Sequence, residues 1–140
     1  SLHGHYPSFN LFEGNIVQEI GISDYWGPIG PGNVYFRNRV ETKDIFVKDH
    51  SHLQNIMANE LVRGRVTVDK TVSHTLIHGN LINSKISWDP AIPDRTWPAS
   101  FYHSSKPAFY GGLAWPSVGA DIPGGTNPAS DRYNAGRHIP

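Results

Sequence analysis

The chain has 140 residues, a formal net charge of zero and no cysteine. Its length is that of a single domain, and its balanced charge argues against a nucleic-acid partner recognised through a basic face. The absence of cysteine excludes a disulfide framework and thiolate chemistry, and no apolar stretch approaches the length that spans a membrane.

A short pattern recurs four times along the first ninety residues. It reads NLFEGNIV from Asn10, NVYFRNRV from Asn33, QNIMANEL from Gln54 and TLIHGNLI from Thr75. Each copy begins with a polar residue, has a large apolar residue two positions later, and contains an asparagine three positions after that residue, with another apolar residue two positions beyond the asparagine. These asparagines follow one another at intervals of 23, 21 and 21 residues, and they are Asn15, Asn38, Asn59 and Asn80.

A second apolar run follows the asparagine in every repeat. These runs are short and alternating, and an aspartate comes at or near the end of each, at Asp24, Asp49, Asp69 and Asp89. Two or three short strands in about 22 residues, with no sustained helical spacing, predict one turn of a parallel β-helix, called a rung below. The sequence therefore predicts an all-β solenoid of about four rungs over residues 1–89.

The recurring asparagines have a predicted structural role. We expect each to take a left-handed backbone conformation at a sharp bend, because asparagine tolerates that conformation better than most residues. A stacked column of amides would also hydrogen-bond from rung to rung and so satisfy its own buried polar groups.

The solenoid pattern stops at Asp89, and residues 90–140 are rich in proline, glycine and aromatic residues without clear periodicity. We expect this segment to form an irregular cap of the same domain over the last rung, whose strand edges and core would otherwise be open. The aromatic residues expected to plug that end are Trp97, Phe101, Tyr102, Phe109 and Trp115.

Three stretches give the chain a family resemblance. They are HGHYPSFNLFEGN (3–15) with the following ISDYWG and VYFRNRV, the asparagine-marked repeats, and SFYHSSKPAFYGGLAWPSVGAD (100–121) with a later DRY. Together they resemble the C-terminal part of right-handed parallel β-helix proteins of the pectate-lyase-like superfamily, as found in large bacterial and phage-associated proteins. The resemblance implies a right-handed solenoid that forms the end of a longer one, or an unusually short one that oligomerises to shield its first rung.

Histidine pairs and aspartates are the candidate metal ligands. His3 and His5 alternate, and so do His50 and His52, so each pair would lie on one face of a strand. Such a pair needs a third ligand, for which Asp24 and Asp49 are the candidates. The sequence requires no cofactor, although calcium would suit a column of aspartates. Surface and turn roles are the favoured explanation of these histidines and aspartates.

Arginines and one aromatic pair are the candidate ligand-binding residues. Arg37 and Arg39 flank Asn38, Arg63 and Arg65 follow one rung later, and arginine suits bidentate binding of carboxylates. Tyr25 and Trp26 precede the glycine- and proline-rich loop 27–32, and insertions in solenoids often form the binding face. The alternative is that both rings pack beneath the loop.

Two functions remain open. The first is interaction with a polysaccharide or oligosaccharide by a secreted, extracellular module of bacterial or phage origin. The resemblance would make such a module part of a polysaccharide lyase or a glycoside hydrolase, although fold alone does not fix activity. The second is a non-catalytic structural module that caps a longer solenoid or forms a homo-oligomer.

Overall fold

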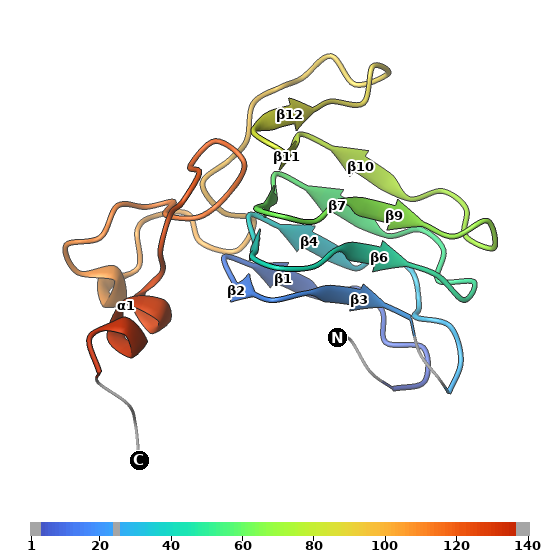
Figure 1. The fold of residues 1–140 in the computed structure, drawn as a ribbon, viewed down its shortest axis with the longest axis horizontal. Coiled ribbons are helices and arrows are strands. Elements are labelled where there is room, and N and C mark those ends of the chain that lie inside the picture. The colour runs from blue at the N-terminus through green and yellow to red at the C-terminus, as the bar shows by residue number, and fades with distance from the viewer. Residues whose placement is uncertain (1–3, 24–25, 137–140) are drawn as a thin grey trace.

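A computed structural model describes residues 4–23 and 26–136, and its strands form three parallel sheets stacked as a β-solenoid of about three rungs (Figure 1). The first sheet contains β1 (Leu11–Glu13), β4 (Val34–Phe36), β7 (Asn55–Met57) and β10 (Leu76–His78). The second contains β2 (Ile16–Val17), β5 (Arg39–Val40), β8 (Glu60–Leu61), β11 (Asn80–Ile82) and β12 (Lys85–Ser87). The third contains β3 (Ile20–Ile22), β6 (Ile45–Val47) and β9 (Val66–Val68). The prediction of a parallel β-solenoid is confirmed, and its right-handed sense stays a prediction.

The fourth repeat departs from the predicted rung. Its first two strands stack on the third rung, but β12 turns back and pairs antiparallel with β11, with Ile82 opposite Lys85. The two residues between them, Asn83 and Ser84, both have positive φ, as a tight two-residue hairpin requires. The apolar run before Asp89 therefore closes a hairpin and does not stack on β9.

Two columns of amide side chains run along the corners of the solenoid. At the corner between the first and second sheets, Asn15, Asn38 and Asn59 each donate a side-chain N–H to Oδ1 of the asparagine in the next rung, at 2.9–3.0 Å. At the corner before the first sheet, Asn10 donates to Asn33, which donates to Gln54. The predicted amide column is confirmed, and the polar residues that open the first three repeats form a second one. Thr75, which opens the fourth repeat, does not join it, because its buried hydroxyl has no hydrogen-bond partner.

The left-handed conformation belongs to the residue before each amide, which corrects the expected backbone role of the asparagines. At the first corner these residues are Gly14, Arg37, Ala58 and Gly79, with φ from 51° to 71°. At the second corner they are Phe9, Gly32 and Leu53, and His74 takes the same conformation before Thr75, with φ from 57° to 76° over the four. One left-handed residue makes the bend, and the amide that follows holds it by hydrogen bonds to the neighbouring rung.

The aliphatic positions of the three sheets face inward and form the core. Ile22, Val40, Ile45 and Ile56 are fully buried, and each lies in register with an apolar residue one rung away. Tyr35 stacks on Phe12 with ring centroids 5.1 Å apart, so an aromatic pair continues the column toward the first rung. Branched side chains on short, twofold-alternating strands fill this interior efficiently.

Most of the C-terminal segment lies along the flank of the solenoid, and only its start, with Asp94 and Trp97 against His78, lies at the fourth repeat that the whole segment was expected to cover (Figure 1). It contacts the corner between the first and second sheets in every rung. The contacts are Asp94 with His78, Ala120 with Ala58, Asp121 with Arg37, and Asn127 with Gly14. The segment ends in a short helix, α1 (Pro128–Asn134), after a single 3-10 turn at Ala108–Tyr110.

The expected aromatic plugs divide into two groups. Trp97 is half-buried, lies 5.9 Å from Trp88 in a stacked arrangement, and contacts His78 of the fourth repeat. Trp115 is also half-buried. Phe101, Tyr102 and Phe109 are exposed, so the prediction that they plug the core is wrong.

Candidate functional site: an aromatic groove beside the first rung

The predicted aromatic pair and first histidine pair lie near the start of the described chain. Tyr25, Asp24 and His3 fall outside the described residues. Trp26 is 68% exposed, and its carbonyl lies 3.4 Å from Nδ1 of His5. The adjoining loop is partly a core element, because Ile29 is buried and Gly30 accepts hydrogen bonds from the amides of Asn33 and Gln54.

The second histidine pair lies in a turn. Asp49 and His50 both have positive φ, so the alternation expected of a strand does not apply to them. The rings of His50 and His52 are 6.0 Å apart in an edge-to-face arrangement, and Nδ1 of His52 accepts the backbone N–H of Ser73. Within the described residues, no three histidine or acidic side chains are grouped so that they could hold a metal ion.

The aspartates do not form the expected column. Val47 lies opposite Val68, and Asp69 follows Val68 directly whereas Asp49 comes two positions after Val47. Asp69 instead closes its own turn by accepting the backbone N–H of Thr71 at 2.8 Å. That hydrogen bond, with one from the Thr71 side chain, lowers the pKa of the Asp69 carboxyl.

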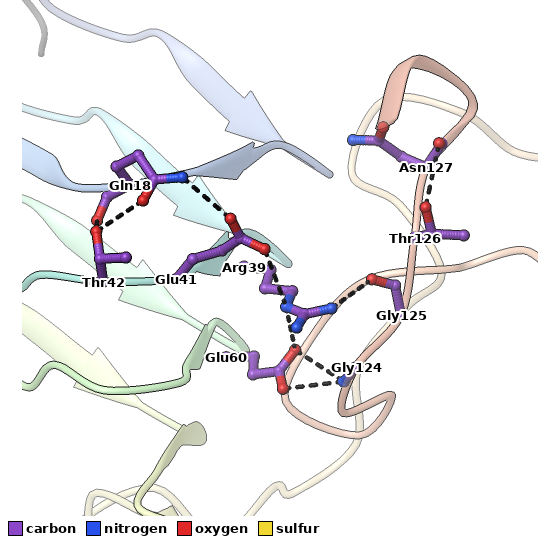
Figure 2. A network of polar contacts seen from close by, with 9 residues as sticks. All are labelled: Gln18, Arg39, Glu41, Thr42, Glu60, Gly124, Gly125, Thr126 and Asn127. Carbon is purple, nitrogen blue, oxygen red and sulfur yellow. Dashed lines mark hydrogen bonds and ion pairs between the residues drawn. The ribbon is translucent and has the colours of Figure 1, made fainter. Parts of the chain in front are cut away.

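Arg37 and Arg39 anchor the C-terminal segment. Arg37 is only 2% exposed; its guanidinium makes a bidentate pair with Asp121 at 2.6 and 3.0 Å and donates to the carbonyl of Pro98 at 2.9 Å. Arg39 donates to the carbonyl of Gly125 and lies 3.6 Å from the Glu60 carboxylate (Figure 2). Both side chains are thus committed to contacts within the protein.

Glu60 and Gln18 extend this network on either side of Arg39. The carboxylate of Glu60 accepts the backbone N–H of Gly124, so Glu60 and Arg39 form hydrogen bonds to two consecutive glycines (Figure 2). On the other side Gln18 donates to Glu41 and accepts from Thr42. The network holds the C-terminal segment against the second sheet.

Arg63 and Arg65 lie elsewhere. Arg39 is in register with Glu60, and Arg63 and Arg65 come after β8, in the connection to β9. Both are exposed, and Arg65 lies 3.9 Å from Asp44. The four arginines therefore do not form one cationic face.

A groove of about 590 Å³ lies between the first rung and the C-terminal segment. Leu11, Glu13 and Gly14 form its floor on the solenoid side. Aromatic residues of the segment and the start of α1 form the other wall: Tyr102, His103, Phe109, Tyr110, Trp115, Asn127, Pro128, Ala129 and Arg132.

Specific hydrogen bonds set the walls of the groove. Oε2 of Glu13 accepts the backbone N–H of Phe101 at 2.8 Å. The side chain of Asn127 donates to the carbonyl of Gly14 at 2.9 Å, while its Oδ1 accepts the N–H of Ser130 and caps α1. The first-rung corner is therefore bonded to the segment at Phe101 and at Asn127. Residues 102–115 form an arch after the first of these points, and the chain then returns to the flank of the solenoid at Ala120.

The arch carries a continuous row of ring contacts. Tyr102 meets His103 at 4.7 Å, His103 meets Phe109 at 6.4 Å, and Phe109 meets Tyr110 at 5.2 Å. Tyr102 is 79% exposed and Phe109 is 66% exposed. Large aromatic surface held open to solvent in a concave site is typical of a binding surface.

Polar groups of both signs line the same groove. Glu13 supplies a carboxylate, and Arg132 supplies a guanidinium that makes no ion pair with another described residue. A second hollow of about 300 Å³ shares Phe109, Tyr110 and Arg132, so the surface continues past α1 toward Gly112 and Leu113.

Sequence reasoning missed this groove because it assigned the aromatic residues to the core. A signal was present in the segment FYHSSKPAFYGG, where the rings sit among serine, lysine and glycine without the twofold alternation of a buried strand.

Comparison of the chain with protein-family models, curated proteins and solved structures finds no match in any of the three. The resemblance to the pectate-lyase-like superfamily therefore stays a prediction. No helix among residues 4–23 and 26–136 is long and apolar enough to cross a membrane.

Proposed function

We propose that this protein binds a carbohydrate chain in the aromatic groove beside its first rung. The observation that carries the proposal is the exposed row of rings from Tyr102 to Tyr110 in a groove of about 590 Å³. Sugar rings present apolar C–H faces that stack on aromatic faces, and a groove of this size fits a few sugar units.

The polar groups that line the groove suit a ligand rich in hydroxyl groups. Tyr102 and Tyr110 carry phenolic hydroxyls, His103 has ring nitrogens, and Glu13 and Arg132 add a charged acceptor and a charged donor. Such groups orient a sugar, while the rings supply most of its buried contact.

We propose binding without turnover at this groove. Hydrolysis of a glycosidic bond normally uses two carboxyl groups across the bond. Glu13 is the only acidic residue among the described residues that line the groove of about 590 Å³, and Asp131 lines the adjoining hollow instead. One oxygen of Glu13 is already engaged by the N–H of Phe101. A polysaccharide-binding module acting outside the cell, related to pectate-lyase-like β-helix proteins, accords with this arrangement.

The test is retention of acidic and neutral polysaccharides by the full chain, with and without calcium, followed by co-sedimentation and by mass spectrometry of any products. We expect retention without new products and without dependence on calcium. Unsaturated or hydrolysed oligosaccharides would instead make the protein a lyase or a hydrolase.

Three variants locate the site. Tyr102→Ala and Phe109→Ala should each weaken retention about tenfold, because each removes an exposed stacking surface. Trp26→Ala is the matched control, since Trp26 is comparably exposed but lies outside the groove. Loss of retention in Trp26→Ala alone would move the site to the loop at 27–32.

A further inference from the structure

The first rung has an unpaired edge in all three sheets. β1, β2 and β3 each pair with one parallel neighbour, in the second rung, and each is the terminal strand of its sheet among the described residues. Unpaired N–H and C=O groups along three parallel edges form a template for another parallel chain.

The hydrogen bonds of the amide columns all run in one direction, from donors in one rung to acceptors in the next. Oδ1 of Asn59 accepts two hydrogen bonds from the preceding rung, one from the backbone N–H of Asn38 at 2.9 Å and one from its side chain at 3.0 Å. Oδ1 of Asn38 accepts the same two bonds from Asn15. Because a backbone N–H can only donate, the acceptor oxygen of each amide must face the preceding rung.

The two amides of the first rung therefore hold unused acceptors. Asn15 donates its side-chain N–H groups to Asn38 and to the carbonyl of Glu13, and Asn10 donates to Asn33 and to the carbonyl of Ser8. No donor among the described residues reaches Oδ1 of either side chain. In the inner rungs the equivalent oxygens each take at least one amide donor from the rung before.

The core is open at the same face. A cavity of about 180 Å³ is lined by Phe12, Val17, Ile20 and Tyr35, which are core positions of the first two rungs, together with Asn15 and Asn38. The hydroxyl of Tyr35 is buried and has no hydrogen-bond partner. In the third rung the position in register with Tyr35, Ile56, is fully buried.

We propose that this first-rung face binds one further parallel β-solenoid rung from outside these 140 residues, with an asparagine or glutamine at both corners. Its strands would pair with the free edges of β1, β2 and β3. Its corner amides would donate to Oδ1 of Asn10 and of Asn15, and its apolar side chains would cover Phe12 and fill the cavity. This inference is independent of the proposed function.

A second copy of this chain does not fit the face. Two copies meeting first rung to first rung would place the acceptor oxygens of Asn15 against each other. In a head-to-tail stack the fourth repeat would have to present the free edge of β11, which β12 already covers. The direction of the amide columns thus excludes the first arrangement and β12 excludes the second, so the face selects a rung of different origin.

The first test inserts a copy of residues 33–53 between Phe9 and Asn10 of the full chain. Leu53 is followed by an amide in the native chain, so the copy meets Asn10 in the same way. We expect the backbone amides of β1, β2 and β3 to exchange with solvent about tenfold more slowly, with β7 and β8 as the internal reference. The matched control carries Asp at both copied asparagines, which places acceptors against acceptors, and it should give no slowing.

The second test keeps the native chain and adds a synthetic peptide of residues 31–55 as the probe. Nuclear magnetic resonance of the labelled chain should show shifts in β1–β3, and the doubly Asp-substituted peptide should not produce them. If the insertion variant fails to fold, the peptide experiment alone tests the proposal. Equal effects of the amide and Asp versions, no response of β1–β3 to the peptide, or a native dimer that protects β1–β3 would each overturn the proposal.

Discussion

Asn38 donates two hydrogen bonds to one atom of Asn59: its backbone N–H and its side-chain N–H both end on Oδ1, at 2.9 and 3.0 Å. The same pair of bonds recurs from Asn15 to Asn38 and from Asn59 to Asn80. Each rung is thus bonded to the next at a corner, in addition to its strand pairing. These bonds to the neighbouring rungs hold each asparagine at its corner of the solenoid.

Asn59→Ala should lower the free energy of unfolding by about 3 kcal/mol, because the backbone and side-chain N–H groups of Asn38 lose their acceptor and the carbonyl of Tyr35 loses a donor in a buried corner. The backbone N–H of residue 59 still reaches Oδ1 of Asn80. Denaturant unfolding measures the loss. Asn15→Ala is the control: Asn15 is exposed at the end of the column, so the change should cost about 1 kcal/mol. Equal losses would contradict the account of the column.

Arg37→Ala should release the C-terminal segment from the flank while the strands remain paired. The change removes a bidentate pair with Asp121 and a bond to Pro98 from a buried site, at a cost of about 2–3 kcal/mol. Limited proteolysis should then cut within residues 98–127. Arg65→Ala, at an exposed ion pair, should change stability by less than about 1 kcal/mol; a comparable loss there would argue against the anchoring role of Arg37.

Gly64→Ala should strain the contact between the second and third rungs. A Cβ at this position would overlap the backbone carbonyl of Lys43, which cannot move aside as a side chain could. We expect a loss of about 1–3 kcal/mol in the free energy of unfolding. Gly112→Ala, where a Cβ would meet nothing within 4 Å, is the matched control and should be nearly neutral. A neutral Gly64→Ala would mean that the rungs are less closely stacked than they are here.

The stability of the protein should fall as the pH rises above 10. Burial raises the pKa of the Tyr35 phenol well above its ordinary value, so the folded state keeps this group neutral. The unfolded chain ionises at about pH 10, and stability that is present below that pH is lost as the pH rises toward the folded-state pKa. Chemical denaturation across this range measures the slope.

Tyr35→Phe separates this effect from general alkaline unfolding. The hydroxyl of Tyr35 has no hydrogen-bond partner, so its removal should leave stability at neutral pH within about 0.5 kcal/mol. The variant should also lose part of the alkaline slope. A large loss at neutral pH would show that the hydroxyl has a partner in solution.

Much of the solenoid could be predicted from sequence because its corners and its core obey one spacing. The interval between Asn38 and Asn59 sets the register of three sheets, and the pattern at Asn10, Asn33 and Gln54 marks the second corner. The identity of the bent residue could not be predicted, because Arg37 and Ala58 have no intrinsic preference for positive φ. Hydrogen bonds to neighbouring rungs hold them there.

The hairpin of the fourth repeat and the path of the C-terminal segment could not be predicted from the sequence. Asn83 and Ser84 reverse the chain, although the apolar run that follows resembles those of earlier repeats. The path of residues 98–127 depends on long-range pairs such as Arg37 with Asp121, which no local pattern reveals. The groove exists only because of that path, so its aromatic residues could not be assigned to a site in advance.

The most direct measurement of the central claim is nuclear magnetic resonance of the labelled chain with an oligosaccharide prepared from whichever polysaccharide it retains. The account predicts that the perturbed backbone amides lie at residues 11–14, 101–115 and 127–132, on both walls of the groove. Perturbations confined to the loop at 27–32, or no response to any member of an acidic and neutral panel, would contradict it.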